Sequence, residues 1–143
     1  MRKLILVLAA LVVSNLSAQN QGGLTIIVKG LRNNKGQVGI RLFDQPKGFP
    51  SKKNRAIQQY FVKPVNNQAK FTISNLSFKN YAVGSIHDEN SNKELDKNFF
   101  GVPKEGFGTS NNPKVFMGAP SYEKAKFTLS KKEQTIVITM KYF

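Results

Sequence analysis

Hydrophobic and polar residues alternate with a period of two along most of this chain. Phe71 and Ile73, for example, alternate with Lys70, Thr72 and Ser74. Successive side chains of a β-strand point to opposite faces, so this period predicts strands with one buried face and one solvent-facing face. Similar runs, with no helical period sustained over three turns, predict seven short strands within residues 24–28, 38–42, 57–62, 70–74, 81–86, 126–129 and 135–142.

The first two runs are separated by Arg32-Asn33-Asn34-Lys35-Gly36, which is rich in turn-forming residues. Two strand-like runs joined by such a segment are typical of a β-hairpin. We therefore predict that residues 24–28 and 38–42 pair with each other as neighbouring strands.

Strands with one apolar face suit antiparallel sheets that pack on one side only, and two such sheets form a sandwich. We predict an all-β fold, an antiparallel sandwich of about seven strands of immunoglobulin-like or transthyretin-like type. A small closed barrel is the alternative.

One long loop, residues 88–122, interrupts the regular spacing of the predicted strands. Its apolar content predicts that it packs back onto the sandwich rather than remaining extended in solvent. Two roles are open for its aromatic side chains: they cap the end of the sandwich, which we favour because such rings bury well, or they line a binding groove. The residues concerned are Phe99, Phe100, Phe107 and Phe116.

The N-terminus has the layout of a cleavable secretory signal. Two basic residues precede the apolar run 4–13, and small polar residues follow, ending at Ala18. The run is shorter than the roughly 20 residues that span a bilayer. We predict a signal peptide at 1–18, one domain at 19–143, and a periplasmic or secreted protein. The chain has no Cys, which excludes disulfides, thiolate metal sites and a lipid-modified cysteine.

The chain is strongly basic, with 22 Lys and Arg against 8 Asp and Glu. After loss of the signal, only Arg32, Arg41 and Arg55 are arginines, and the lysines are scattered. Specific nucleic-acid recognition relies on arginine forks, so we predict no specific nucleic-acid binding. Weak association with anionic envelope surfaces is the expected effect of the charge, and we expect a monomer.

Half of the acidic residues fall within one short polar run, "HDENSNKELD" at 87–96. From Asp88, every second residue carries a side-chain oxygen, as in calcium loops of the Asp-x-Asn-x-Asn kind. The run predicts a Ca²⁺ site, and the alternative is a plain polar turn whose side chains bond their own backbone. The predicted metal ligands are Asp88, Asn90, Asn92, Glu94 and Asp96, with further oxygens from Asp44, Glu105 or Asn111.

The predicted calcium loop departs from the usual pattern at two positions. Lys93 stands where glycine normally provides a positive φ, and Phe99 stands where a bidentate Glu is usual. A positive φ at a residue other than glycine costs about 1 kcal/mol.

Three blocks resemble an uncharacterised family of secreted bacterial proteins, domain of unknown function 2141. They are "GLRNNKGQVGIRLFDQPKGFP", "SIHDENSNKELDKNFFGVPKEGFGTSNNP" and the final alternating strand. The resemblance covers roughly residues 24–143 and implies an exported β-sandwich without an established activity. The acidic block of the family resembles His-Asp-Glu-Asn-Gly-Asn-Gly-x-Leu-Asp, from which this chain departs at Ser91 and Lys93. The block is also similar, more loosely, to the ion-binding loops of Cna-B-like and carboxypeptidase-regulatory-like modules.

His87 is the only histidine and stands beside Asp88, the residue types of a general acid–base pair. No Gly-x-Ser-x-Gly elbow accompanies them, and one His cannot form a zinc site. We therefore predict a non-catalytic binding or structural module, with His87 packed at a strand end and bonded into the following loop. The alternatives are an envelope hydrolase that uses His87 and Asp88, and a basic polyanion-binding protein.

Overall fold

The computed structural model describes residues 19–114 and 117–143. The predicted signal peptide 1–18 and Phe116 lie outside the described residues. The described strands and helices are β1 (Gln21–Lys29), β2 (Gln37–Phe43), η1 (Lys53–Arg55), β3 (Gln58–Val62), β4 (Ala69–Ser77), β5 (Asn80–Asp88), β6 (Gly106–Thr109), α2 (Tyr122–Ala125), β7 (Phe127–Thr128) and β8 (Glu133–Thr139).

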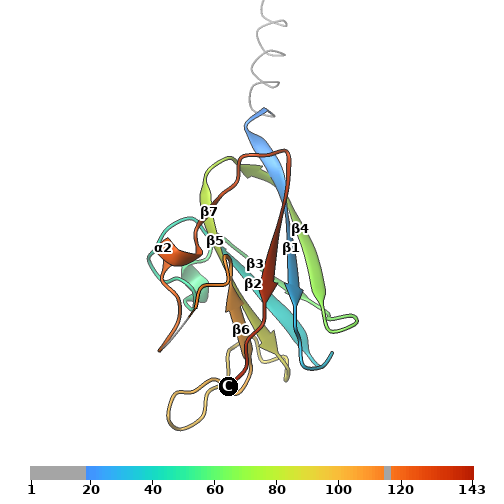
Figure 1. The fold of residues 1–143 in the computed structure, drawn as a ribbon, viewed down its shortest axis with the longest axis vertical. Helices are drawn as coiled ribbons and strands as arrows, with labels where there is room; N and C mark the ends of the chain where they lie inside the picture. Colours follow the sequence, from blue (N-terminus) through green and yellow to red (C-terminus); the bar gives the residue numbers. More distant parts are fainter. Residues whose placement is uncertain (1–18, 115–116) are drawn as a thin grey trace, which may run out of the picture.

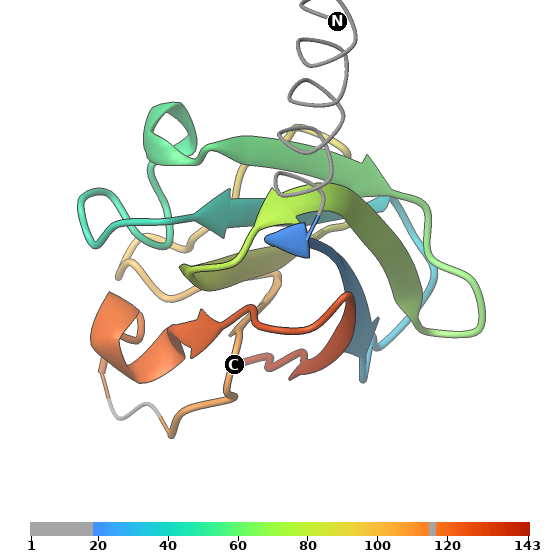
Figure 2. The same cartoon turned by 90° about the horizontal axis from the view of Figure 1, so that it is seen from above.

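The strands form two sheets that pack as a β-sandwich-like arrangement (Figure 1). The first sheet has the order β4-β1-β8, and the second has the order β3-β2-β5-β6, with β7 paired to β5. Figure 2 shows the arrangement from above, with β3 and β8 on opposite sides of the molecule. The predicted all-β class and two-layer packing are confirmed.

The core between the sheets is built from the alternating positions that the sequence predicts. In β1, Leu24, Ile26 and Val28 are fully buried, and in β2 Val38, Ile40 and Leu42 are fully buried. Complete burial of a side chain of this size stabilises the fold by about 1.5–3 kcal/mol. The alternation is therefore the main determinant of which strand faces point inward.

The predicted hairpin of residues 24–28 and 38–42 is wrong. β1 pairs with β4 and β8 in the first sheet, whereas β2 pairs with β3 and β5 in the second. The connecting segment crosses from one layer to the other and buries Leu31 beneath it. A hairpin loop runs over the surface and cannot bury an apolar side chain such as that of Leu31. The apolar residue within this turn-like segment therefore favours a connection that crosses between the two sheets.

The prediction of a wholly antiparallel fold is also corrected, because β1 and β8 run parallel. Gly23 lies opposite Glu133, and Lys29 lies opposite Thr139. The chain returns from β7 in the second sheet to the end of the first sheet at which β1 begins. Alternation within a strand specifies its buried face but not its direction.

A strand, β6, lies inside the segment that the sequence predicts as a loop. Its sequence Gly-Phe-Gly-Thr has no apolar alternation, because its inward positions are glycines. A Cβ on Gly106 would lie 2.6 Å from the Met140 side chain, and a Cβ on Gly108 would lie 2.7 Å from that of Ile138. These positions need glycine because β6 lies directly against β8 and the residues that follow it.

The two sheets are joined along one side by backbone hydrogen bonds. Phe107 and Lys141 exchange both N–H···O bonds, at 3.0 and 2.9 Å. The face of the second sheet that points away from the first sheet carries the short helix α2. This helix packs over Phe43 and Ala82, and Ser121 is its N-cap. No helix within residues 19–114 and 117–143 has the length and apolar character needed to cross a membrane.

Candidate functional site

The acidic run forms a turn directly after β5, held by the carboxylate of Asp88. Asp88 is fully buried. Its Oδ1 accepts the backbone N–H of Asn92 at 3.0 Å, and its Oδ2 accepts the backbone N–H of Lys93 and the Gln37 side-chain amide, each at 2.8 Å. Asp88 therefore fixes the path of the turn.

Three of the five predicted metal ligands converge at the rim of this turn. The side-chain amides of Asn90 and Asn92 both donate to the Asp96 carboxylate. Their amide oxygens accept the backbone N–H groups of Asn92 and Glu94 at 3.2 and 3.0 Å. The NH₂ group and the oxygen of each amide are thus both hydrogen-bonded. A cation bound at Asp96 would have to replace the bonds between these amides and the Asp96 carboxylate.

The other predicted ligands point elsewhere. The Glu94 carboxylate lies 3.4 Å from Lys53 Nζ, and Asp88 is directed at the backbone. Within the part of the chain that the structure describes, no group of three or more His, Cys, Asp or Glu side chains could hold a metal ion. A cation in this turn would therefore rely mainly on neutral amide and carbonyl oxygens.

Of the three residues suggested as further oxygen donors, only Glu105 lies at the turn. Its carboxylate accepts the backbone N–H groups of Glu89 and Asp96, at 2.9 and 3.1 Å. Asp44 pairs with Lys79 at 2.9 Å, and Asn111 donates to the carbonyls of Lys124 and Lys126. Asp44 and Asn111 thus bond to other parts of the molecule.

The turn places residues other than glycine in the left-handed region. Ser91 has φ +59° and Lys93 has φ +67°. The expected positive φ at Lys93 is confirmed, and the two departures from the glycines of the resembled pattern are the two strained positions. Left-handed conformations cost L-residues about 1–2 kcal/mol.

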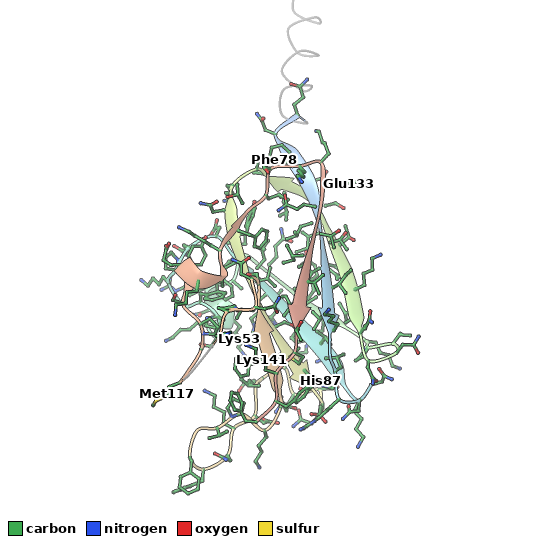
Figure 3. All side chains as sticks on the ribbon, viewed as in Figure 1. Lys53, Phe78, His87, Met117, Glu133 and Lys141 are labelled. Atoms are coloured by element: carbon green, nitrogen blue, oxygen red, sulfur yellow. The ribbon has the colours of Figure 1, made fainter. Side chains whose placement is uncertain are left out.

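His87 is fully buried, and both of its ring nitrogens are engaged. Nε2 lies 2.9 Å from the carbonyl oxygen of Lys35, which can only accept, so Nε2 carries the proton. In the neutral ring, Nδ1 then accepts from the Tyr142 hydroxyl at 2.7 Å. The predicted bond into the following loop is wrong: His87 instead binds the β1–β2 connection and the segment after β8. Figure 3 shows His87 and Lys141 near one end of the sandwich, with Phe78 and Glu133 at the other.

Glu89 links the acidic turn to the β1–β2 connection. It accepts Arg32 Nε at 2.9 Å and the Asn33 amide at 3.0 Å. Burial acts to raise the pKa of Glu89, but the hydrogen bonds of Asn33 and Arg32 and the Arg32 charge outweigh burial and hold that pKa below its ordinary value. The Arg32 guanidinium also lies over the Tyr142 ring, 4.7 Å from its centroid.

A groove of about 1000 Å³ covers the outer face of the second sheet. Its floor is formed by Gly39, Gly84, Ile86 and Phe107, and its two walls come from residues 50–54 and 94–103. Gly84 leaves room for Pro50, since a Cβ there would lie 3.0 Å from the proline ring. We call this feature the outer groove. The sequence signal for it is the pair of glycines at outward positions of β2 and β5.

The outer groove is basic as well as apolar. Its described lining includes Arg41, Lys52, Lys53 and Lys97, against Glu94 as the acidic member. Arg41 donates to the Gln59 amide and to the carbonyls of Ser51 and Lys93, at 2.9, 2.8 and 3.2 Å. It thereby ties both walls to β2 through neutral acceptors.

Burial lowers the pKa of Arg41, and the Glu94 charge opposes this effect. An arginine retains its charge in such surroundings, because the guanidinium group is not deprotonated in proteins. The groove therefore contains a half-buried positive charge that no described carboxylate pairs with.

The prediction that the loop aromatics cap the sandwich is wrong for two of them. Phe99 is 98% exposed and Phe100 is 85% exposed. They lie in the turn of residues 97–104, which we call the 97–104 loop. Phe107 lies in β6, where its ring stacks on Phe143 with centroids 5.6 Å apart. Phe100 and Phe107 line the outer groove, as the groove alternative predicted for these two, whereas Phe99 is not part of the lining.

Comparison with known proteins gives a family without an assigned activity. The family model described as "Uncharacterized protein conserved in bacteria (DUF2141)" matches residues 26–137. No curated protein and no solved structure is similar enough to count as a match.

Proposed function

The chain belongs to the bacterial family described as uncharacterized, DUF2141, and from this premise we propose that it is an exported, non-catalytic binding module whose ligand occupies the outer groove. The observation that carries the proposal is the combination of an apolar floor with a rim of four basic side chains. Ligand sites are typically apolar concavities of 300–1,000 Å³ with a few placed polar groups. The ligand class that fits is a small molecule with an apolar body and an acidic group.

The surroundings of the only histidine support a non-catalytic role. His87 is buried with both nitrogens bonded, and Ser85 Oγ donates to the Gly39 carbonyl at 2.9 Å. A general base must reach the proton that it abstracts. Neither side chain faces the groove with a free polar atom, so a hydrolase that uses His87 and Asp88 has less support.

The test is a titration with anilinonaphthalene sulfonate, which has an apolar ring system and one anionic group, followed by displacement with dodecanoate. We expect saturable fluorescence enhancement that dodecanoate reverses. The rim variant Lys52→Gln/Lys53→Gln should weaken binding roughly fivefold, because ~1 kcal/mol is lost when nearby charges are removed. Ile86→Thr should weaken it through the floor while retaining a β-branched residue.

Two controls separate the groove from the rest of the surface. Lys124→Gln/Lys131→Gln removes the same charge at sites outside the groove lining, and Phe99→Ser removes an exposed ring beside the groove. Both should bind the probe as the wild type does. Equal weakening in the rim variant and in the lysine control would reject the groove as the binding site.

We also propose that Ca²⁺ stabilises the acidic turn, supported by the position of the Asp96 carboxylate beside Asn90 and Asn92, whose amides would turn their oxygens toward the ion in place of their present bonds. These residues would hold the ion together with backbone carbonyls. Extracellular calcium modules bind with dissociation constants of about 10⁻⁴–10⁻³ M. The melting temperature of the wild type should rise with millimolar Ca²⁺ and fall again with chelator. Asp96→Asn should abolish the rise; an equal rise in that variant would show that Ca²⁺ acts elsewhere.

The proposal includes export and a topology. A signal peptide cleaved near Ala18 would release residues 19–143 to the periplasm or medium, which the mass of the extracellular or periplasmic protein tests directly. We further propose an immunoglobulin-like or transthyretin-like sandwich. The passage of the chain between sheets after β1, β3, β4 and β7 supports this type, since such crossings build two-sheet Greek-key sandwiches. An experimental structure would test the strand order.

A further inference from the structure

Two of the three most exposed large apolar residues of the described chain, Phe99 and Phe100, lie together at one tip, and the third, Met117, lies elsewhere (Figure 3). Phe99 and Phe100 are 98% and 85% exposed, and their rings contact each other edge to face with centroids 5.6 Å apart. Val102, beside them, is 39% exposed. Figure 1 shows this loop projecting beyond the strands at the end of the sandwich that carries the C-terminus. Two adjacent phenylalanines in water are costly unless something covers them.

Most backbone N–H groups of the 97–104 loop are hydrogen-bonded within the loop. Asn98 Oδ1 accepts the N–H groups of Phe100 and Val102, at 2.9 and 3.0 Å, and the Asn98 carbonyl accepts that of Gly101 at 3.0 Å. The Asn98 N–H donates to the Val102 carbonyl at 2.8 Å. Unpaired backbone groups are the main cost of placing a loop in a lipid environment, and here the N–H groups of Asn98, Phe100, Gly101 and Val102 are already paired.

The charged residues within the 97–104 loop have one sign. Lys97 and Lys104 flank the loop, and both are exposed. No acidic residue lies between them. On either side, Glu105 is buried and bonded to the backbone of Glu89 and Asp96, and the Asp96 carboxylate accepts the side-chain amides of Asn90 and Asn92. Aromatic rings between lysines match the layers of an anionic bilayer surface, because the rings enter the headgroup–acyl boundary while the ammonium groups meet the phosphates.

We propose that the 97–104 loop is a membrane-docking tip that inserts Phe99 and Phe100 into the surface of an anionic phospholipid bilayer. Net charge alone accounts only for diffuse attraction, whereas this arrangement assigns the contact to one loop. The proposal is independent of what occupies the outer groove. Because the tip forms part of one groove wall, docking would place the groove mouth near the lipid surface.

The chain contains no tryptophan, so a single indole introduced at the tip is an unambiguous probe. We would measure the fluorescence of the Phe99→Trp variant with vesicles of phosphatidylglycerol and phosphatidylethanolamine, and with phosphatidylcholine alone. The expected result is a blue shift and quenching by brominated acyl chains with the anionic vesicles only. The matched control is Val65→Trp, at a 67% exposed position in another turn, which should remain in water.

Co-sedimentation with the same vesicles separates insertion from charge. Phe99→Ser/Phe100→Ser should reduce the partition coefficient by roughly tenfold or more, since two partly buried rings are lost. Lys97→Gln/Lys104→Gln should also reduce it, and Lys124→Gln/Lys131→Gln should reduce it less. Sedimentation that survives the double serine variant, while the indole of the Phe99→Trp variant stays in water, would overturn the proposal in favour of surface charge. A blue shift that depends on protein concentration without vesicles would overturn it in favour of a second copy covering the tip.

Discussion

The hydroxyl of Tyr142 donates to Nδ1 of His87 across 2.7 Å and joins β5 to the segment that follows β8. The same hydroxyl accepts the backbone N–H of Arg32 at 3.1 Å. Burial raises the pKa of Tyr142, so the hydroxyl keeps the proton that it donates. Three segments distant in the sequence therefore meet at one oxygen atom.

Removal of this oxygen should destabilise the fold. In Tyr142→Phe, both the buried Nδ1 of His87 and the N–H of Arg32 lose their partner, which should cost about 1–3 kcal/mol in the free energy of unfolding. Tyr60→Phe is the control. Among the described residues the Tyr60 hydroxyl bonds only to Gln58 on its own strand, and its loss should cost under about 0.5 kcal/mol. Urea denaturation of both variants measures the difference. Equal losses would mean that the contact with His87 contributes nothing specific.

Substitutions at Gly36 and Gly101 should separate the cost of backbone strain from the cost of a steric clash. Both have positive φ, +64° and +79°. A Cβ on Gly36 would lie 2.0 Å from the carbonyl oxygen of Asp88, whereas nothing lies within 4 Å of one on Gly101. Gly101→Ala should therefore lose only about 1 kcal/mol from the left-handed conformation, and Gly36→Ala should lose about 3 kcal/mol or more. Thermal unfolding of the two variants checks the order, and similar midpoints would contradict the close approach.

Replacement of Ser91 by glycine should stabilise the fold, because a residue with a Cβ is strained in the left-handed conformation. Ser91→Gly should stabilise the protein by about 0.5–1 kcal/mol after the added chain entropy of glycine is subtracted. Ser74→Gly makes the same change at an exposed position of β4, where it should destabilise by a similar amount. Opposite signs in chemical denaturation are the expected outcome. A loss of stability at both sites would show that the turn does not hold Ser91 in this conformation.

Glu89 should contribute to the acid sensitivity of the fold. Its pKa is held below the ordinary value of 4.5 by Asn33 and Arg32 against the effect of burial. A carboxyl with a depressed folded-state pKa contributes stability that is present above pH 4.5 and is lost as the pH falls toward the lower, folded-state value. Glu89→Gln should therefore show a shallower fall in stability across that interval than the wild type. Arg32→Gln should move the loss of stability to higher pH. If both variants lose stability with acid as the wild type does, Glu89 does not contribute to the acid sensitivity.

The sequence predicted which residues face the core but not how the strands are arranged. Leu24, Ile26 and Val28 are buried as their alternation requires. The same alternation is compatible with a hairpin or with separate sheets, and the buried Leu31 was the residue that could have indicated the crossing. Strand β6 was missed because Gly106 and Gly108 leave its inner face without side chains.

For the candidate site, the sequence predicted which residues form the acidic turn but not where their side chains point. The spacing of the acidic run located a real turn, and the positive φ at Lys93 followed from it. The spacing did not indicate that Asp88 would be directed at backbone amides or that Glu94 would pair with Lys53. The outer groove is assembled from segments of the chain that are far apart, and no local pattern could have placed Arg41 between the two walls.

The parallel pairing of β1 with β8 has a consequence for how the chain folds. Residues 23 and 133 must meet before the central strand of the first sheet has both neighbours, and such contact order slows folding into the range of milliseconds to seconds. Until then one side of β1 presents unpaired N–H and C=O groups along the stretch Leu24-Thr25-Ile26-Ile27-Val28, which is rich in β-branched residues. During that interval the nascent protein is most vulnerable to intermolecular strand addition, and holdase chaperones would be expected to act on this edge.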